Sequence, residues 1–203
     1  MSTPAYTRLP VDERRSRLLE LGEELFTRHA YDELSMSGIA RAAGISKALL
    51  YHYFPSKQAY FTATLERAAA DLAAAVAPDP ALPVAEQLAS SLAAYLDWIG
   101  EHRDAYAVLL RSVGVIPDLR ETVVAVREQT AQSILAGVHP DGPPPPALRA
   151  AVRGWLLFLD GVLTDWIEHD DLERPQLEAL ALDALRGAVR AAGVPAAADR
   201  LGG

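Results

Sequence analysis

The chain has 203 residues, of which half are apolar and 23% charged; this is a globular composition, and it excludes disordered and collagen-like architectures. With no cysteine, disulfide frameworks, thiolate metal sites and thiol nucleophiles are excluded, and a reducing compartment, the cytoplasm, is expected. Neither a signal peptide nor a run of about 18 apolar residues, the length of a membrane span, is recognisable, so no membrane partner is expected.

The first part of the chain is predicted to form four helices, at about 11–29, 35–44, 46–54 and 57–77. Ser35 and Ser46 each offer an N-cap hydroxyl, and Gly44 ends the second helix. The fourth, alanine-rich helix follows Pro55 and has a length of about 31 Å at 1.5 Å per residue, which is long enough to join two domains.

The second part, after three prolines between 78 and 83, is predicted to form five more helices, at about 84–100, 102–113, 118–138, 147–169 and 175–193. The last ten residues are expected to fray. No run alternates with period two for long enough to be a strand. We therefore predict an all-α chain of about nine helices, with a first domain at 1–56, a connecting helix at 57–77 and a larger domain at 78–203.

The formal net charge of −8 is unevenly distributed. Residues 1–67 carry nine basic and eight acidic side chains, a net +1, whereas residues 68–203 carry ten and nineteen, a net −9. The window 35–57 holds both lysines of the protein, Lys47 and Lys57, and no acidic residue. A partner that carries phosphates is therefore expected to bind at this positive patch.

The same window meets the physical requirements of a helix-turn-helix, in which two helices cross closely through a tight turn. The motif needs small side chains at the crossing, a glycine at the turn and apolar contacts between the helices. The residues at these places are Ile39, Ala40, Ala43, Gly44, Ile45, Leu50 and Tyr53. The third helix then presents an outward face that fits a DNA major groove. Lys47 suits guanine or phosphate, and the apolar Ala48 and Leu49 suit a thymine methyl.

These residues resemble the TetR/AcrR family of bacterial transcriptional regulators. The resemblance is carried by RRSRLLELGEELF at 14–26 and by SMSGIARAAGISKALLYHYFPSKQAYF at 35–61, with its Tyr-x-x-Phe-x-x-Lys ending. It implies base contacts from Lys47 to Leu49, phosphate contacts from Tyr51, Tyr53 and Lys57, and a second helix whose N-terminus, Ser35 to Ser37, faces the DNA backbone. The last point also follows from physics, because free N–H groups and the positive end of a helix dipole suit an anion.

The predicted DNA-binding residues are thus Ser35, Ser37, Ser46, Lys47, Ala48, Leu49, Tyr51, His52, Tyr53 and Lys57. Two of them have an alternative interpretation. Tyr53 occupies a core position of the motif and either packs there or reaches DNA through its hydroxyl. His52 is either a specific contact or an exposed residue without a role.

The helix at 147–169 is apolar nearly all round, which favours burial on every side. We predict that it lies at a dimer interface, where Gly154 and Gly161 permit close helix contact and Val162 and Trp166 pack. The resemblance points the same way, because it implies a homodimer built from the last two helices. The alternative is a fully internal helix in a monomer.

A small-molecule site in the second domain is predicted from aromatic side chains and a few charged ones, the usual composition of such a site. Its candidate residues are Tyr95, Trp98, Tyr106, Arg111, Arg153, Trp155, Phe158 and Asp160. The alternative for this set is a filled core. Arg153, Asp160 and Thr164 lie close together on one helix, and if buried they either pair with one another or receive a ligand.

No enzyme chemistry, cofactor or metal site is expected. Neither lysine follows a phosphate-binding glycine loop, no GxSxG occurs, and the acidic residues at 168–173 lie at a turn between helices. The expected function is a ligand-responsive, homodimeric DNA-binding repressor of a near-palindromic operator, with a largely apolar effector. The alternatives are a small-molecule carrier, a constitutive DNA-binding dimer without an effector, and a small all-α enzyme.

Overall fold

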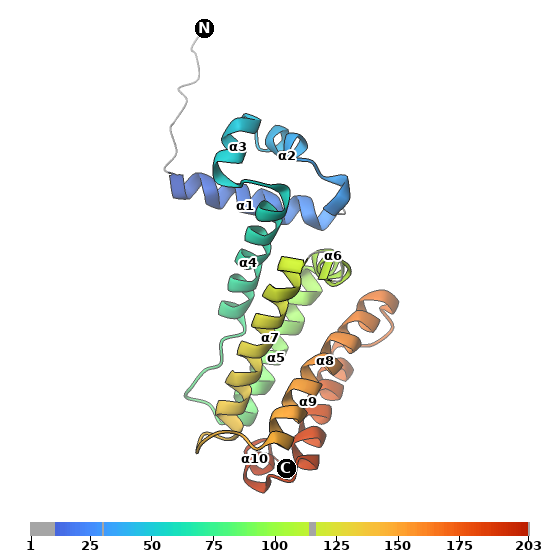
Figure 1. Cartoon of the computed structure of the whole chain (residues 1–203). Coiled ribbons are helices and arrows are strands. Elements are labelled where there is room, and N and C mark those ends of the chain that lie inside the picture. The colour runs from blue at the N-terminus through green and yellow to red at the C-terminus, as the bar shows by residue number, and fades with distance from the viewer. Residues whose placement is uncertain (1–10, 30, 114–116, 203) are drawn as a thin grey trace. The chain divides into compact units, whose positions relative to one another are not determined.

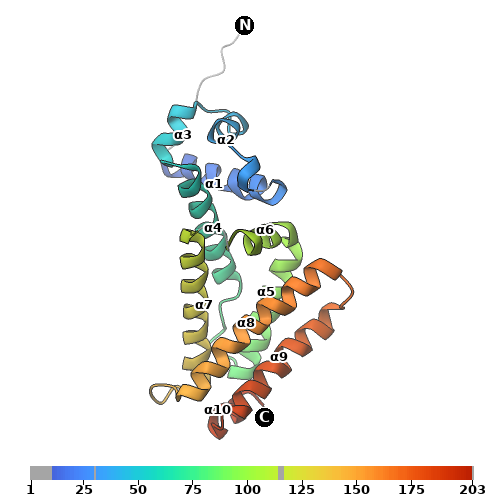
Figure 2. The same cartoon turned by 45° about the vertical axis from the view of Figure 1, so that its right-hand side comes forward.

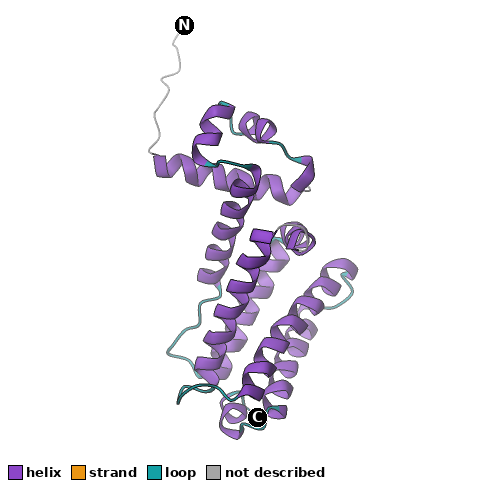
Figure 3. Ribbon diagram, in the orientation of Figure 1, coloured by secondary structure: helices purple, strands orange, loops and turns teal. Residues whose placement is uncertain are grey.

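The computed structural model describes residues 11–29, 31–113 and 117–202, without the side chains at 11, 105, 110–113 and 117–119. All regular structure in these ranges is helical (Figure 3), as ten α-helices and one short 3-10 turn, so the all-α prediction is confirmed. The chain divides into two compact units, residues 1–69 and 70–203. None of the described helices is long and apolar enough to cross a membrane.

The first unit contains α1 (Val11–Arg28), the 3-10 turn η1 (Tyr31–Glu33), α2 (Met36–Ala42), α3 (Lys47–Tyr53) and the first part of α4 (Lys57–Ala75), as Figure 1 shows. Its core is formed by buried apolar side chains from these elements: Leu18, Leu19, Phe26, Met36, Ile39, Ala40, Leu50, Phe54, Tyr60, Phe61 and Ala63. Burial of each large apolar side chain contributes about 1.5–3 kcal/mol. Four of these rings form one cluster, which holds α1, the end of α3 and α4 together.

The tight turn between α2 and α3 forms where the sequence predicts it. Gly44 has a φ of 65°, in the left-handed region that glycine adopts without strain. The next amide, Ile45 N–H, donates to the carbonyl of Ala40 at 3.0 Å and closes the end of α2. Ser35 Oγ accepts from Gly38 N–H and Ser46 Oγ from Leu49 N–H, each at 3.1 Å, so both predicted N-caps are confirmed.

The second unit contains the end of α4 and six further helices, which Figure 2 shows from a second direction: α5 (Val84–Glu101), α6 (Arg103–Val113), α7 (Pro117–Val138), α8 (Pro146–His169), α9 (Arg174–Ala191) and α10 (Pro195–Arg200). The helices α8 and α9 run side by side in opposite directions (Figures 1 and 2). The Trp155 indole N–H, on α8, donates to the carbonyl of Ala181, on α9, at 2.8 Å. One continuous apolar core joins all six helices from α5 to α10.

The end of the chain differs from the sequence prediction. Instead of fraying, residues 195–200 form α10, and Ala197 and Leu201 are buried in the core of the second unit. Arg186 on α9 donates to the carbonyl of Leu201, and Arg200 donates at 3.1 Å to the carbonyl of Val138 on α7. These tertiary contacts hold a helix that is too short to persist by itself.

Candidate nucleic-acid interface

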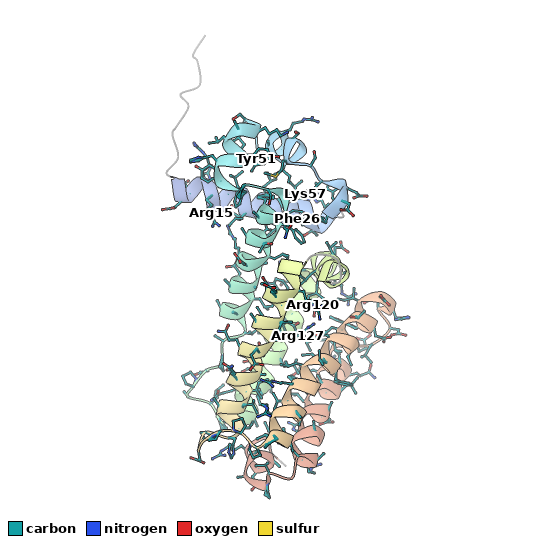
Figure 4. The ribbon with its side chains drawn as sticks, in the orientation of Figure 1. Arg15, Phe26, Tyr51, Lys57, Arg120 and Arg127 are labelled. Carbon is teal, nitrogen blue, oxygen red and sulfur yellow. The ribbon has the colours of Figure 1, made fainter. Side chains whose placement is uncertain are left out.

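The outward face of α3 matches the face predicted for it. Lys47, Ala48, Tyr51 and His52 are exposed, and Leu49 is half-buried. The ring of Tyr51 is 42% exposed, and the ammonium of Lys47 lies 5.7 Å from its centroid (Figure 4 labels Tyr51). Positive charge and an aromatic hydroxyl therefore lie together on a short, water-facing helix.

The starts of α2 and α3 add three hydroxyl groups to this face. Ser35, Ser37 and Ser46 are exposed, and the hydroxyls of Ser35 and Ser46 already accept a backbone hydrogen bond as N-caps. Each keeps its own O–H as a donor, which suits a phosphate oxygen. Tyr53 is half-buried between His52 and Phe54, so its ring packs in the unit.

Two basic residues at this end of the first unit are absent from the predicted set. Arg41, in the last turn of α2, is exposed in the acid-free window, and that window was the signal that could have identified it. Arg15, labelled in Figure 4, is an exposed residue of α1 whose guanidinium lies 5.5 Å from the centroid of the Phe54 ring. Only the fold brings Arg15 beside the end of α3, since the two are far apart in the sequence.

Among the predicted DNA-binding residues, Lys57 has the surroundings that differ most from its predicted role, a contact with a DNA phosphate. Its ammonium donates to the carbonyl oxygens of Tyr31 at 2.9 Å and Leu34 at 3.0 Å. It also lies 4.1 Å from the centroid of the Tyr31 ring. Two of its three N–H donors are therefore used inside the unit, and a phosphate contact would have to use the third.

The predicted ligand residues of the second unit separate into two groups. Tyr95, Tyr106 and Asp160 come together: the two hydroxyls are 3.1 Å apart, and the Tyr106 hydroxyl is near enough to the Asp160 carboxyl to act on its pKa. The fourth member is Arg127, on α7 (labelled in Figure 4), whose guanidinium forms an ion pair with Asp160. We call these four residues the polar cluster; it connects α5, α6, α7 and α8.

Burial governs the protonation of the polar cluster. It raises the pKa of Tyr95 to about 12 and also raises the pKa of Tyr106, so both hydroxyls stay protonated. Burial likewise raises the pKa of Asp160, against the opposing effect of Arg127. The sequence offered one signal for Arg127, which directly follows the apolar run VVAV at 123–126 on a helix that packs against α8.

The other predicted ligand residues lie elsewhere. Trp155 packs in the core against α9, Trp98 stacks on His102 with ring centroids 4.4 Å apart, and Phe158 is 39% exposed. Arg153 pairs with Glu128 at 2.7 Å, not with Asp160 or Thr164, so the predicted pairing within α8 is wrong. The side chain of Arg111 lies outside the described residues.

The helix α8 is buried on one side only. Gly154, Leu157, Phe158 and Gly161 form an exposed row, with Leu157 61% exposed and, apart from chain neighbours and the nearby backbone of α8 itself, no described atom within 4 Å of a Cβ placed on either glycine. We call this row the apolar stripe. Val162 beside it is half-buried.

Trp166, predicted to lie at a subunit interface, is buried inside the unit. Its indole N–H donates to the carbonyl of Leu172 at 2.9 Å, and the guanidinium of Arg103 lies 4.3 Å from its ring centroid. Within the described part of the chain, no three histidine or acidic side chains gather closely enough to hold a metal ion.

Comparison with known proteins relates each unit to a family model. A model described as "Bacterial regulatory proteins, tetR family" matches residues 18–64, and one described as "Tetracyclin repressor-like, C-terminal domain" matches residues 84–187. The second match alone covers half of the chain. The two matches fall in the two compact units.

Individual relatives agree with these matches. The HTH-type transcriptional activator FasR of Mycolicibacterium smegmatis is 33% identical over 107 residues, which span 52% of this chain and about half, 49%, of that protein. The HTH-type transcriptional regulator UidR of Escherichia coli is 28% identical over 186 residues, covering 86% of this chain and 92% of that protein. A crystal structure of a tetR-family transcriptional regulator from Streptomyces coelicolor has a TM-score of 0.82 at 30% identity and covers 96% of this chain and 90% of its own.

Proposed function

This chain belongs to the TetR family of bacterial regulatory proteins, and from that premise we propose that it is a homodimeric, ligand-responsive repressor of a near-palindromic operator in the cytoplasm. Its relatives are transcriptional regulators, and we propose no enzymatic activity for it. The observation that carries the proposal is the acid-free outward face of α2 and α3, on an otherwise acidic chain.

In the proposed complex α3 enters the major groove. Lys47, Ala48 and Leu49 contact base edges, as the first turn of a recognition helix does. The hydroxyls of Ser37 and Tyr51 and the guanidinium of Arg41 contact phosphates on either side. Phosphate contacts set the position of the protein on DNA, and base contacts set its sequence preference.

Exchange of Lys47 for alanine tests the division between base and phosphate contacts. The probes are a duplex selected by the wild-type protein from a random-sequence library, and a duplex of unselected sequence. Lys47→Ala is expected to lose about tenfold more affinity for the selected duplex than for the unselected one. Arg41→Ala is expected to weaken both about equally and to lower the slope of log K against log salt by about 0.9.

Arg149→Ala, an exposed charge change in the second unit, is the control for net charge and is expected to alter neither affinity. Equal losses for Lys47→Ala on the two duplexes would contradict a base contact from this residue.

A second copy of the chain is the partner we propose for the apolar stripe. Small residues at Gly154 and Gly161 permit close approach of another helix, and Leu157 and Phe158 supply apolar area. The neighbouring helix α9 exposes Leu180 and the unobstructed Gly187. In a dimer with two-fold symmetry, the exposed faces of α8 and α9 in one copy would pack against the same faces of the other copy.

Gly161→Arg is expected to give monomers of 21.9 kDa, because a long charged side chain in the stripe blocks close helix contact. Sedimentation velocity measures the mass. Ala136→Arg, at an exposed position of α7, is the matched control and is expected to leave a dimer. The monomer should also lose operator affinity, since two half-sites must be held together. A Gly161→Arg protein that sediments as a dimer would place the interface elsewhere.

For the effector we propose a largely apolar molecule bound in the second unit, with Arg127, Asp160 and Tyr106 as its polar anchors. The support is a polar cluster set in a continuous apolar core. A panel of hydrophobic compounds, assayed for release of the selected duplex, tests it. Operator DNA must alter effector affinity by the same factor as the effector alters DNA affinity. DNA affinity that no compound changes would favour a constitutive DNA-binding dimer.

A further inference from the structure

The contacts of Lys57 connect the first residue of α4 to the chain that precedes α2. The two carbonyls that its ammonium binds, those of Tyr31 and Leu34, belong to residues 26 and 23 positions earlier, respectively. We call residues 31–34 the entry turn, because Ser35, the N-cap of α2, follows it directly. Charge-assisted hydrogen bonds of this kind are about twice as strong as neutral ones.

The Tyr31 side chain adds to the connection between the entry turn and α4. Its own closing hydrogen bond, from Leu34 N–H to the Tyr31 carbonyl, is long at 3.4 Å. The Tyr31 ring lies between Lys57 and the ring of Phe61, whose centroid is 5.1 Å away, so both of its aromatic contacts come from α4. The start of α4 therefore contacts both ends of the entry turn, Tyr31 and Leu34.

We propose that Lys57 is a positioning residue, which fixes the start of α2 against α4 and affects DNA binding only through that placement. The inference rests on the proposed DNA-binding role of α2 and α3. It assigns the lysine a role different from the phosphate contact that the family resemblance implies.

The test replaces each of the two lysines of the protein. Lys57→Met keeps most of the aliphatic stem and removes the charge and all donors; Lys47→Met does the same on the exposed face of α3 and is the matched control. Lys57→Gln has amide donors but no charge, so it separates the effect of the hydrogen bonds from the effect of the charge. The first readout is hydrogen exchange at the amides of Gly38 and Ile39, which form the first turn of α2.

We expect exchange at these two amides to accelerate at least tenfold in Lys57→Met, to recover in part in Lys57→Gln and to stay unchanged in Lys47→Met. This readout needs no DNA, so it decides the positioning role even if the wild-type protein binds no duplex and the proposed function fails. If Lys57→Met does not fold, the Lys57→Gln protein carries the test.

The second readout is the salt dependence of binding to the unselected duplex. A positioning residue releases no counterion, so both Lys57 variants should keep the wild-type slope of log K against log salt while their affinity falls several-fold at every salt concentration. A phosphate ligand would instead lower the slope by about 0.9. A lowered slope in Lys57→Gln, with unchanged exchange at Gly38 and Ile39, would overturn the proposal.

Discussion

Arg127→Met is expected to destabilise the second unit by about 2 kcal/mol, because it leaves the Asp160 carboxylate partly buried without its counter-charge. The Asp160 side chain is 23% exposed and that of Arg127 31%, so water offsets part of the loss that a fully buried pair would show. The nearby Tyr106 hydroxyl lowers the pKa of the carboxyl, but it is uncharged and cannot neutralise it. Urea unfolding followed by tryptophan fluorescence measures the change, since all three tryptophans lie in the second unit.

The Arg127→Met loss should depend on pH with a definite sign. Burial already raises the pKa of Asp160 in the folded protein, and removal of Arg127 raises it further. A folded-state pKa above the unfolded value of about 3.9 favours folding at low pH, and that contribution is lost as pH rises through the folded pKa. The deficit should therefore be full at pH 7 and shrink as pH falls through the raised pKa of Asp160.

Two further variants control this experiment. Arg127→Met combined with Asp160→Leu should recover most of the stability, because an apolar pair replaces a buried ion pair at little cost. Arg153→Met breaks the exposed ion pair with Glu128 and should change the unfolding free energy little. A deficit that is the same at pH 4.5 and pH 7, or that the double variant does not relieve, would show that lost packing and not the uncompensated charge is responsible.

Gly22→Ala is expected to destabilise the first unit by about 2 kcal/mol, although alanine is the better helix former by about 1 kcal/mol. A Cβ at this position of α1 would lie 2.4 Å from Thr64 Oγ1 and 3.0 Å from the Tyr60 hydroxyl, both on α4. Neither group can move freely. Thr64 is buried and bonded to the Tyr60 carbonyl, and the Tyr60 hydroxyl donates to the Leu18 carbonyl at 2.6 Å.

Because the closest atom in the expected clash belongs to Thr64, a second substitution at that residue should relieve it. Thr64→Ala removes the closest atom, so the double variant should regain part of the stability lost in Gly22→Ala. Gly100→Ala on α5 is the control, because its Cβ would make only an ordinary contact, 3.9 Å from the Trp166 ring, and it should be neutral or stabilising. Hydrogen exchange of α1 amides reports on the first unit separately. A Gly22→Ala protein as stable as the wild type would mean that α1 and α4 separate at no cost.

Much of the first unit is encoded locally and could be predicted from the sequence. The N-caps at Ser35 and Ser46 and the left-handed Gly44 act on amides within a few residues, so their effects do not depend on distant parts of the fold. The outward face of α3 followed from helical spacing around Leu50 alone. The all-α class followed from the helical spacing of apolar residues and the absence of alternating runs.

The tertiary structure decided what depends on partners far along the chain. Lys57 binds carbonyls more than twenty residues away, Asp160 pairs with an arginine on another helix, and Trp166 is buried within its own unit. The sequence of an apolar helix face or of a charged residue does not show which distant residue will contact it. Hydrophobic burial and Coulomb attraction depend on proximity in space and not on position in the sequence. Helix periodicity therefore shows which residues of α8 share a face. It does not show which face packs in the core and which face, with Leu157 and Phe158, is exposed to solvent.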